Sequence, residues 1–376
     1  ILQILDLSGI PIHSCERTDD MPIVIGGGPC SYNPEPLADF FDIFYIGEGE
    51  VRYDELFELY KKCKKLKIAR GDFLRLASHI EGMYVPCLYE VQYDNDGIIS
   101  SFKPVFDDVP EIVKRQIVTD MDKVHFINKP VVPFIKVTQD RVVLELMRGC
   151  IRGCRFCQAG FVYRPLREHS VEYLKNYALT MLEITGAQEI SLSSLSSSDY
   201  SGLSQLLEFL IEYTGKHNIN ISLPSLRIDS FSLDIMKRVQ DIKKSSLTFA
   251  PEAGTQRLRD VINKGITQED IIGGAMQAFK GGWNKVKLYF MLGLPTENED
   301  DIKGIPLLCE KLAEKYYEIP KDERNGKVQI TASSSFFVPK PFTPFQWSSM
   351  LKREQYLERA YLVKDTLKEQ LNKKSI

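Results

Sequence analysis

One short stretch decides the fold and the chemistry of this chain: Arg148-Gly149-Cys150-Ile151-Arg152-Gly153-Cys154-Arg155-Phe156-Cys157. Its three cysteines have the spacing C-x3-C-x2-C and follow directly after an apolar run, residues 142–147. Thiolates are the ligands that iron–sulfur clusters require, and three thiolates on a cluster of four irons leave one iron open. The stretch therefore predicts a loop that holds such a cluster and offers one iron to a further ligand.

Two other interpretations of the cysteines fit less well. A structural zinc site closes its tetrahedron with a fourth Cys or His. The next histidine, His169, stands twelve residues beyond Cys157 in a polar segment. Unrelated buried cysteines are also a poor explanation, because a free Cys usually occurs singly as a small core residue.

The composition is that of a globular protein with two or three domains, since 43% of the 376 residues are apolar and 26% are charged. No apolar run is long enough to span a bilayer, and no leader suggests secretion. Eight cysteines are too few for a disulfide scaffold, and the five outside the loop, Cys15, Cys30, Cys63, Cys87 and Cys309, are scattered without pair spacing, so we expect a reducing, cytoplasmic location. A net charge of -3 gives no basic footprint for general nucleic-acid binding.

Residues 1–80 are expected to form part of an α/β domain. The chain begins at Ile1 with what looks like a strand, so we expect a fragment of a longer protein. Short strands at 22–25 and 42–46 each run into glycines, and a helix is expected over 52–65. Ligands of parallel sheets bind beyond the carboxyl ends of strands, where glycine lets the backbone approach closely. The candidate ligand-binding positions are Gly27, Gly28, Gly47 and Gly49. Turn formation alone explains these glycines equally well.

Three further segments complete the expected domain organisation. Residues 81–140 are predicted to be a linker that carries a β-ribbon, since Asp94-Asn95-Asp96-Gly97 is a hairpin signal. Residues 141–348 are predicted to form a barrel, and residues 349–376 a C-terminal helix that packs on it. The proline-rich and aromatic segment 336–347 is interpreted as a loop that covers the barrel's open side, with a polyproline ligand as the alternative.

Strand and helix signals alternate from residue 142 onward. Strands are expected at 142–147, 189–193, 218–223, 246–250, 285–292 and 329–335, and helices at about 170–185, 201–215, 230–240, 254–263, 267–280 and 298–318. Ser170 and Thr267 are plausible N-caps, and Gly186 and Gly281 plausible helix stops. Six βα units in succession predict a parallel sheet that curls into a full or partial barrel, with its working groups at the carboxyl ends of the strands.

The predicted strand ends carry unusual residues. The first ends in the cysteine loop, and the second in a serine-rich run, residues 193–200, interpreted as hydroxyl donors to a ligand rather than as a flexible linker. The third ends near Arg227, which could clamp a carboxylate. The fourth ends near Glu252 and the fifth at Gly293. We expect these groups to surround the same open end of the barrel.

The cysteine loop, with Phe156 just before its last cysteine and a βα barrel behind it, resembles the radical S-adenosylmethionine (SAM) superfamily. The resemblance implies an α/β fold with a partial (β/α)6 barrel, and a [4Fe-4S] cluster on Cys150, Cys154 and Cys157. SAM would chelate the fourth iron, and its reductive cleavage would give a 5′-deoxyadenosyl radical. An external low-potential donor would supply the electron. The SAM contacts that the resemblance implies are Phe156, Ser194, Ser196, Ser225, Arg227, Glu252 and Gly293.

The N-terminal stretch resembles the later part of the Rossmann-like cobalamin-binding domain that precedes the barrel in one large class of these enzymes. The glycines at 26–28 and the sequence Gly47-Glu48-Gly49-Glu50 carry this likeness. Nearly the whole chain is similar to an uncharacterised bacterial family with the same domain order. The resemblance implies a cobalamin-dependent enzyme that transfers a methyl group to an unactivated carbon, or modifies such a carbon in another radical reaction. No residue indicates a catalytic acid or base, or identifies the substrate, which could be a small molecule, RNA or protein.

Two other functions stay open. A methylthiotransferase-like enzyme acting on RNA or a ribosomal protein would need a second cluster on three further cysteines, and Cys15, Cys30, Cys63 and Cys87 look too dispersed for that. A non-catalytic iron–sulfur sensor or scaffold would leave the polar strand ends without a role.

Overall fold

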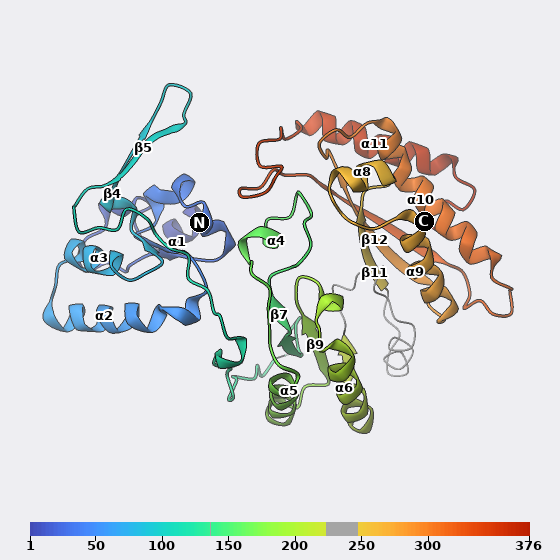
Figure 1. Ribbon diagram of the computed structural model, residues 1–376, viewed down its shortest axis with the longest axis horizontal. Coiled ribbons are helices and arrows are strands. Elements are labelled where there is room, and N and C mark those ends of the chain that lie inside the picture. Colours follow the sequence, from blue (N-terminus) through green and yellow to red (C-terminus); the bar gives the residue numbers. More distant parts are fainter. Residues whose placement is uncertain (136, 223–246) are drawn as a thin grey trace. The chain divides into compact units, whose positions relative to one another are not determined.

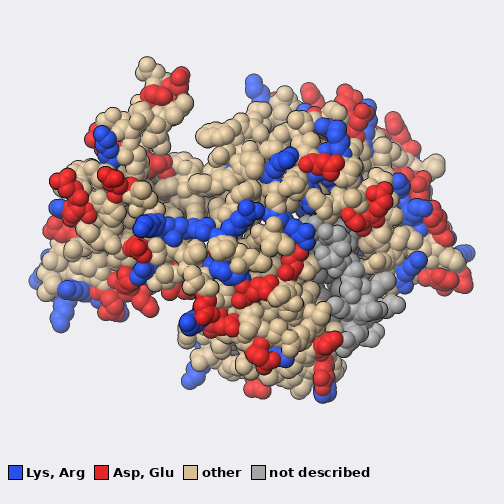
Figure 2. Space-filling view, viewed as in Figure 1, with Lys and Arg blue, Asp and Glu red and all other residues tan. Residues whose placement is uncertain are grey.

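The computed structural model describes residues 1–135, 137–222 and 247–376, which form two compact units, residues 1–125 and 126–376 (Figure 1). The predicted helix at 230–240, together with Ser225 and Arg227, lies outside the described residues. Basic and acidic side chains are interspersed over most of the face drawn in Figure 2. Among the described helices, none is both long and apolar enough to cross a membrane.

The first unit contains a three-stranded sheet in the order β1-β2-β3, with β1 parallel to β2 and β3 antiparallel to it. These strands are β1 (Ile25–Gly26), β2 (Ile43–Tyr45) and β3 (Met83–Tyr84), and the helices are α1 (Leu2–Leu7), α2 (Tyr53–Leu66) and α3 (Arg70–Ser78). The predicted strand at 42–46 and the helix after it are confirmed, whereas the strand predicted at 22–25 is observed only at Ile25–Gly26. The strand expected at Ile1 is wrong, because Ile1, Ile4 and Leu5 are spaced for one face of helix α1.

The predicted β-ribbon is confirmed as the antiparallel pair β4 (Tyr89–Tyr93) and β5 (Ile99–Pro104). Its turn follows from the sequence, since Gly97 has a φ of 77° and the Asp94 carboxylate accepts the backbone N–H of Ile98 at 2.8 Å. The rings of Tyr89 and Phe102 stack with their centroids 5.0 Å apart. The ribbon falls within the first compact unit, residues 1–125.

The second unit contains the six predicted βα strands, arranged as two parallel sheets in the orders β10-β9-β6 and β11-β12-β13. The strands are β6 (Val142–Glu145), β9 (Glu189–Ser193), β10 (Asn220–Ser222), β11 (Leu247–Glu252), β12 (Lys285–Leu292) and β13 (Gln329–Phe336). The helices after them include α5 (Val171–Thr185), α6 (Leu203–His217), α8 (Gln256–Val261), α9 (Gln268–Lys280) and α10 (Glu299–Glu318). The predicted α/β class is confirmed.

The helix boundaries follow from local side-chain chemistry. Ser170 caps α5 by accepting the N–H of Tyr173, and Gly186 ends that helix in the left-handed region with a φ of 64°. Thr267 and Asp270 form a capping box at the start of α9. These contacts confirm the predicted caps Ser170 and Thr267 and the stop Gly186, and Gly281 is the C-cap of α9.

Each sheet of the second unit has its own apolar core. One core lies between β6, β9 and β10 and helices α5 and α6. The other lies between β11, β12 and β13 and helices α9 and α10. The C-terminal helix α11 (Arg353–Glu369) packs on the second core through Ala360, Leu362 and Val363, as predicted. The strand ends are thereby fixed on well-packed supports.

Candidate functional site

The cysteine loop is enclosed by a small antiparallel pair, β7 (Met147–Arg148) and β8 (Arg167–Glu168). Gly149 begins the loop with a φ of 91°, in the left-handed region. A Cβ at this position would lie 2.7 Å from the carbonyl oxygen of Pro165 and 2.8 Å from that of Tyr163. Only glycine can make this turn without moving the opposite strand, so Gly149 sets the direction in which Cys150 leaves the sheet.

The three thiols are presented on one loop and are each partly exposed. The N–H of Cys157 bonds to the carbonyl of Cys154 at 3.1 Å, and the N–H of Arg152 points to the sulfur of Cys150 at 3.4 Å. Among the described residues, no three metal-binding side chains converge closely enough to hold a single ion. A four-iron cluster binds each thiolate at a different iron, so its ligands need no common centre. Three thiols from one loop are the donor chemistry that an iron–sulfur cluster requires.

The end of α8 holds one side of the cysteine loop. The side-chain amide of Asn263 donates to the carbonyl of Gly153 at 2.9 Å. The N–H of Arg155 donates to the carbonyl of Ile262 at 2.9 Å, and its guanidinium to that of Val261 at 2.7 Å. The loop after β7 is thus fixed by the segment that follows β11.

The carboxyl ends of three strands meet the cysteine loop at the ring of Phe156. A small apolar cluster contains Ala253, Leu294 and Phe337, which follow β11, β12 and β13 respectively, and Phe156 packs against it. Phe156 stands between two of the three cysteines. The expectation that the strand ends gather around the cysteine loop is therefore confirmed for these strands.

The segment at 336–347 contacts the same loop. The N–H of Phe345 donates to the carbonyl of Arg155 at 3.3 Å, and the amide of Gln158 donates to the carbonyl of Pro341 at 3.4 Å. The Phe345 ring also packs against the small cluster around Phe156. These contacts support its interpretation as a covering loop.

Glu252, the last residue of β11, has a φ of 68°, which is uncommon for a residue other than glycine. Its carboxylate lies 3.1 Å from the ammonium of Lys264, which lies 5.8 Å from the centroid of the Phe156 ring. Burial raises the pKa of Glu252, and Lys264 acts in the opposite direction. No pattern in the sequence marks Lys264, since a lone lysine after a helix gives no signal.

Predicted SAM contacts Ser194 and Ser196 lie in the turn after β9. The hydroxyl of Ser194 accepts the N–H of Ser196 at 3.2 Å, and the hydroxyl of Ser196 donates to Asp199 at 2.7 Å. Ser196 is buried, whereas Ser194 is partly exposed. Asp199 in turn forms an ion pair with Arg152 of the cysteine loop. No pattern in the sequence indicates this pair, whose members stand 47 positions apart.

Gly293 follows β12 with a φ of 83°, and its N–H donates to the carboxylate of Glu297 at 2.9 Å. A Cβ there would lie 2.6 Å from the ring of Tyr356 in α11. Glu297 also bonds to Arg359 of α11 at 2.9 Å, and burial raises the pKa of Glu297. Gly293 therefore allows the C-terminal helix to approach the strand end. Its contact with SAM stays a prediction.

The four glycines proposed for ligand binding in the first unit have different surroundings. Gly47 forms a bridge with Gln116, whose carbonyl would lie 2.3 Å from an added Cβ. Gly28 has a φ of 85° and open space where a side chain would project. A Cβ at Gly27 would lie 3.3 Å from the hydroxyl of Tyr53, and one at Gly49 would lie 2.7 Å from its ring. Gly49 and Tyr53 also line a cavity of about 790 Å³ together with residues from 117–125.

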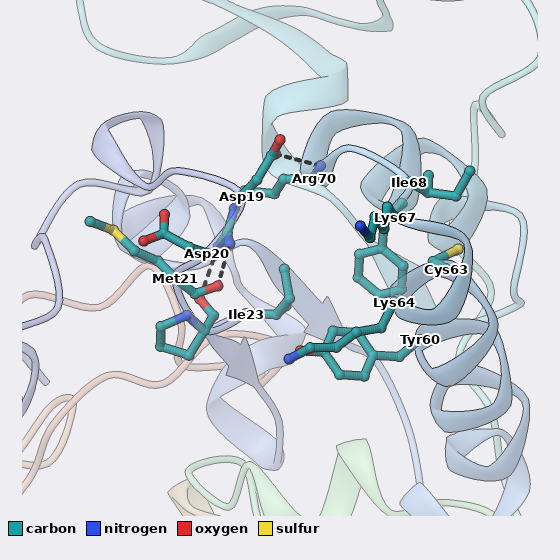
Figure 3. A pocket seen from close by; sticks show the side chains of 12 residues that line it. Asp19, Asp20, Met21, Ile23, Tyr60, Cys63, Lys64, Lys67, Ile68 and Arg70 are labelled. Carbon is teal, nitrogen blue, oxygen red and sulfur yellow. Dashed lines mark hydrogen bonds between the residues drawn. The ribbon is translucent and has the colours of Figure 1, made fainter.

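A second cavity of the first unit, about 710 Å³, is lined in part by residues 19–23, which precede β1 in the sequence (Figure 3). Tyr60 and Lys64 of α2 form one wall, and Arg70 begins α3 beside it. The Asp19 carboxylate accepts the N–H of Arg70 at 2.7 Å, as Figure 3 shows. This cavity contains none of the residues predicted to bind a ligand.

Family models match both units. Residues 1–86 match the model described as radical SAM proteins, N-terminal, and residues 144–308 match the radical SAM superfamily model. The second match covers the cysteine loop and the strands up to β12.

Curated relatives extend this likeness. An uncharacterised protein of Methanocaldococcus jannaschii is 30% identical over 360 residues, which are 93% of this chain and 68% of the relative. A Pyrococcus horikoshii protein, named an uncharacterised methyltransferase, is 22% identical over 77% of this chain and 58% of its own length. A second M. jannaschii protein, assigned provisionally by name to the methylthiotransferases, is 27% identical over 43% of this chain and 37% of its own length. The chain thus spans little more than a third to two thirds of these relatives.

Two solved structures share the fold. The radical SAM methyltransferase TsrM from Kitasatospora setae, with cobalamin and a [4Fe-4S] cluster bound, gives a TM-score of 0.53 at 12% identity, over 85% of this chain and 58% of that one. The cobalamin-dependent radical SAM enzyme OxsB, with aqua-cobalamin and SAM bound, gives 0.50 at 16% identity, over 91% and 43%.

Proposed function

The chain belongs to the radical SAM superfamily of enzymes, and from this premise we propose that it binds a [4Fe-4S] cluster on Cys150, Cys154 and Cys157 and cleaves SAM reductively. The observation that carries the proposal is the loop itself. Three partly exposed thiols follow a glycine turn at a strand end, and three further strand ends pack against Phe156 between two of them. The cluster, when bound, would supply the electron that cleaves SAM.

The chain's own residues would bind and shield the reactants. Glu252 and Lys264 place one carboxylate and one ammonium beside Phe156, which are groups suited to the hydroxyl and carboxylate groups of SAM. Ser194 offers a partly exposed hydroxyl at the next strand end. The segment around Phe345 would exclude water and oxygen from the loop.

The test is SAM cleavage. The protein is reconstituted with iron and sulfide without oxygen, reduced with dithionite and given SAM, and 5′-deoxyadenosine is measured. The matched control is Cys150→Ala, which removes one thiolate and leaves the glycine turn intact. Product above this control supports the proposal, and equal product in both contradicts it.

We propose further that the full protein uses cobalamin to transfer a methyl group to an unactivated carbon, or to modify such a carbon in another radical reaction. The cobalamin named in the two similar structures supports this, as do the glycines at the carboxyl ends of β1 and β2 and the cavity beside Gly49. Cobalamin that co-purifies with full-length protein is the supporting result. A full-length protein that binds none in a cobalamin titration contradicts it.

Methylthiotransferase activity is the second candidate, because one relative carries that name. It would require a second cluster. In the described residues Cys15, Cys30 and Cys87 are exposed and Cys63 is buried. About four irons per chain would favour the first candidate and about eight the second.

The electron donor and the location follow from the proposed chemistry. We propose a cytoplasmic protein with an external low-potential reductant, because a reduced cluster requires both a donor and a reducing environment. The substrate class is best sought with the full protein, since this chain spans 68% or less of the relatives compared.

A further inference from the structure

Arg152 is tied to its surroundings at three points, although it binds no cluster iron itself. Its backbone N–H points to the sulfur of Cys150 at 3.4 Å, and its carbonyl accepts from the guanidinium of Arg164 at 3.1 Å. Its own guanidinium reaches Asp199 through two hydrogen bonds, with Nε 3.0 Å from Oδ2. Such paired bonds fix both the distance and the plane of an arginine.

Asp199 stands at the other end of this connection. Its carboxylate also accepts the hydroxyl of Ser196 at 2.7 Å, so it joins the turn after β9 to the loop after β7. Its side chain is 8% exposed, whereas that of Arg152 is 33% exposed. A carboxylate buried to this extent depends on its partners, because an unpaired buried charge is strongly unfavourable.

We propose that Asp199 is a positioning residue of the cluster site: it holds Arg152 so that the Arg152 N–H stays on the sulfur of Cys150. The inference rests on the proposed function, since it assumes that Cys150 is a cluster ligand. Hydrogen bonds to cluster sulfurs set the reduction potential, and residues that orient metal ligands typically change metal affinity by about 10- to 100-fold when replaced. Asp199 would also connect the cluster loop to the serine turn, so that binding of SAM at that turn would affect the cluster.

The test uses the variant Asp199→Asn, which keeps the size of the side chain and an acceptor for Ser196 but loses the charge. In reconstituted protein we expect iron to pass to a chelator about tenfold faster than in the wild type. We also expect a more negative midpoint potential, because loss of the N–H donor to sulfur disfavours the more negatively charged, reduced cluster. Loss of the Asp199 charge alone would shift the potential in the opposite direction, so a negative shift identifies the hydrogen bond. The matched control is Glu172→Gln, which breaks an exposed ion pair with Lys175 on α5 and should change neither value.

A double variant separates this role from a loss of folding. If Asp199 acts through Arg152, Arg152→Gln with Asp199→Asn should release iron no faster than either single variant, because the two changes remove the same interaction. The proposal is overturned if the effects of the two single variants on the rate of iron release multiply in the double variant. It is also overturned if Asp199→Asn releases iron at the wild-type rate and keeps the wild-type midpoint potential. If the reconstituted wild type takes up no cluster, its iron content shows this before any variant is compared. That result contradicts the proposed function rather than the role of Asp199.

Discussion

The ammonium of Lys264 and the carboxylate of Glu252 form a pair at the end of β11, 3.1 Å apart, with side chains that are 13% and 16% exposed. The ammonium of Lys264 lies 5.8 Å from the centroid of the Phe156 ring, and Phe156 stands between Cys154 and Cys157 in the sequence. Glu252 adopts a left-handed backbone conformation to reach this position. Strained backbone at a strand end is a common feature of functional sites, so this pair is the first place to test SAM binding.

Lys264→Met should weaken SAM binding by about tenfold or more, because it removes a positive charge and leaves Glu252 buried without its ionic partner. The loss of the pair should also lower the free energy of unfolding by roughly 3 kcal/mol. Equilibrium binding of SAM to the reconstituted protein and urea unfolding measure the two effects. Lys303→Met, which breaks an exposed pair on α10, is the control. Unchanged SAM affinity in Lys264→Met would place the pair outside the SAM site.

Gly149→Ala should abolish cluster binding while the domain still folds, because the new Cβ would collide with the carbonyl oxygens of Pro165 and Tyr163 and turn Cys150 away. The control is Gly186→Ala at the end of α5. Gly186 has a similar positive φ but no atom within 4 Å of its added Cβ. The Gly186→Ala substitution should lower the free energy of unfolding by only about 1 kcal/mol, and the variant protein should keep its iron. Iron content and thermal unfolding separate the two variants, and normal iron in Gly149→Ala would contradict the role of this turn.

Asp301 should make the second unit sensitive to acid. Burial alone would raise the pKa of Asp301, but hydrogen bonds from Arg257 and Thr255 outweigh it and lower the pKa below 3.8. Because folding lowers the pKa of Asp301, its ionised carboxylate stabilises the folded state fully above pH 3.8. This stabilisation is lost as the pH falls through the pKa of Asp301 in the folded protein. Asp301→Asn should therefore cost about 2 kcal/mol at neutral pH and progressively less below pH 3.8.

Urea unfolding of wild type and Asp301→Asn across this pH range measures the difference. Asp365→Asn, in an exposed pair with Lys368, should show little effect at any pH. A difference between wild type and Asp301→Asn that stays constant with pH would contradict the assignment.

Phe345→Ala should make the cluster more sensitive to oxygen without preventing its assembly. The Phe345 ring packs against the apolar side chains around Phe156. Removal of this ring should therefore open the covering loop to solvent. Loss of cluster absorbance in air should be several times faster than in the wild type. Trp347→Ala is the control, since Trp347 is 89% exposed and lies two residues further on. Equal rates for the two variants would argue against a covering role.

Elements with strong local signals could be predicted from the sequence. The six strands after residue 142, the caps at Ser170 and Thr267 and the hairpin at Gly97 are set by nearby side chains, and each was found where expected. The helix at Leu2–Leu7 was mistaken for a strand, because short apolar runs suit both periods.

The contacts that hold the cysteine loop could not be predicted. Arg152 and Asp199 meet only because β6 and β9 are neighbours, and Lys264 reaches Glu252 only through the turn after α8. The glycines at the strand ends also fit two interpretations, ligand binding and close packing. The conformations of Gly47 and Gly293 are explained by the close approach of Gln116 and Tyr356, so composition alone could not separate packing from ligand binding.

The hydrogen bond from Gln158 to Pro341 joins residues 183 positions apart. Contacts of such long sequence separation form late in folding, because a large loop must close before they contribute. This contact of the cysteine loop can therefore form only once the chain has been synthesised as far as residue 341. A chain truncated before that residue would keep its three cysteines but lose this contact with the segment at 336–347.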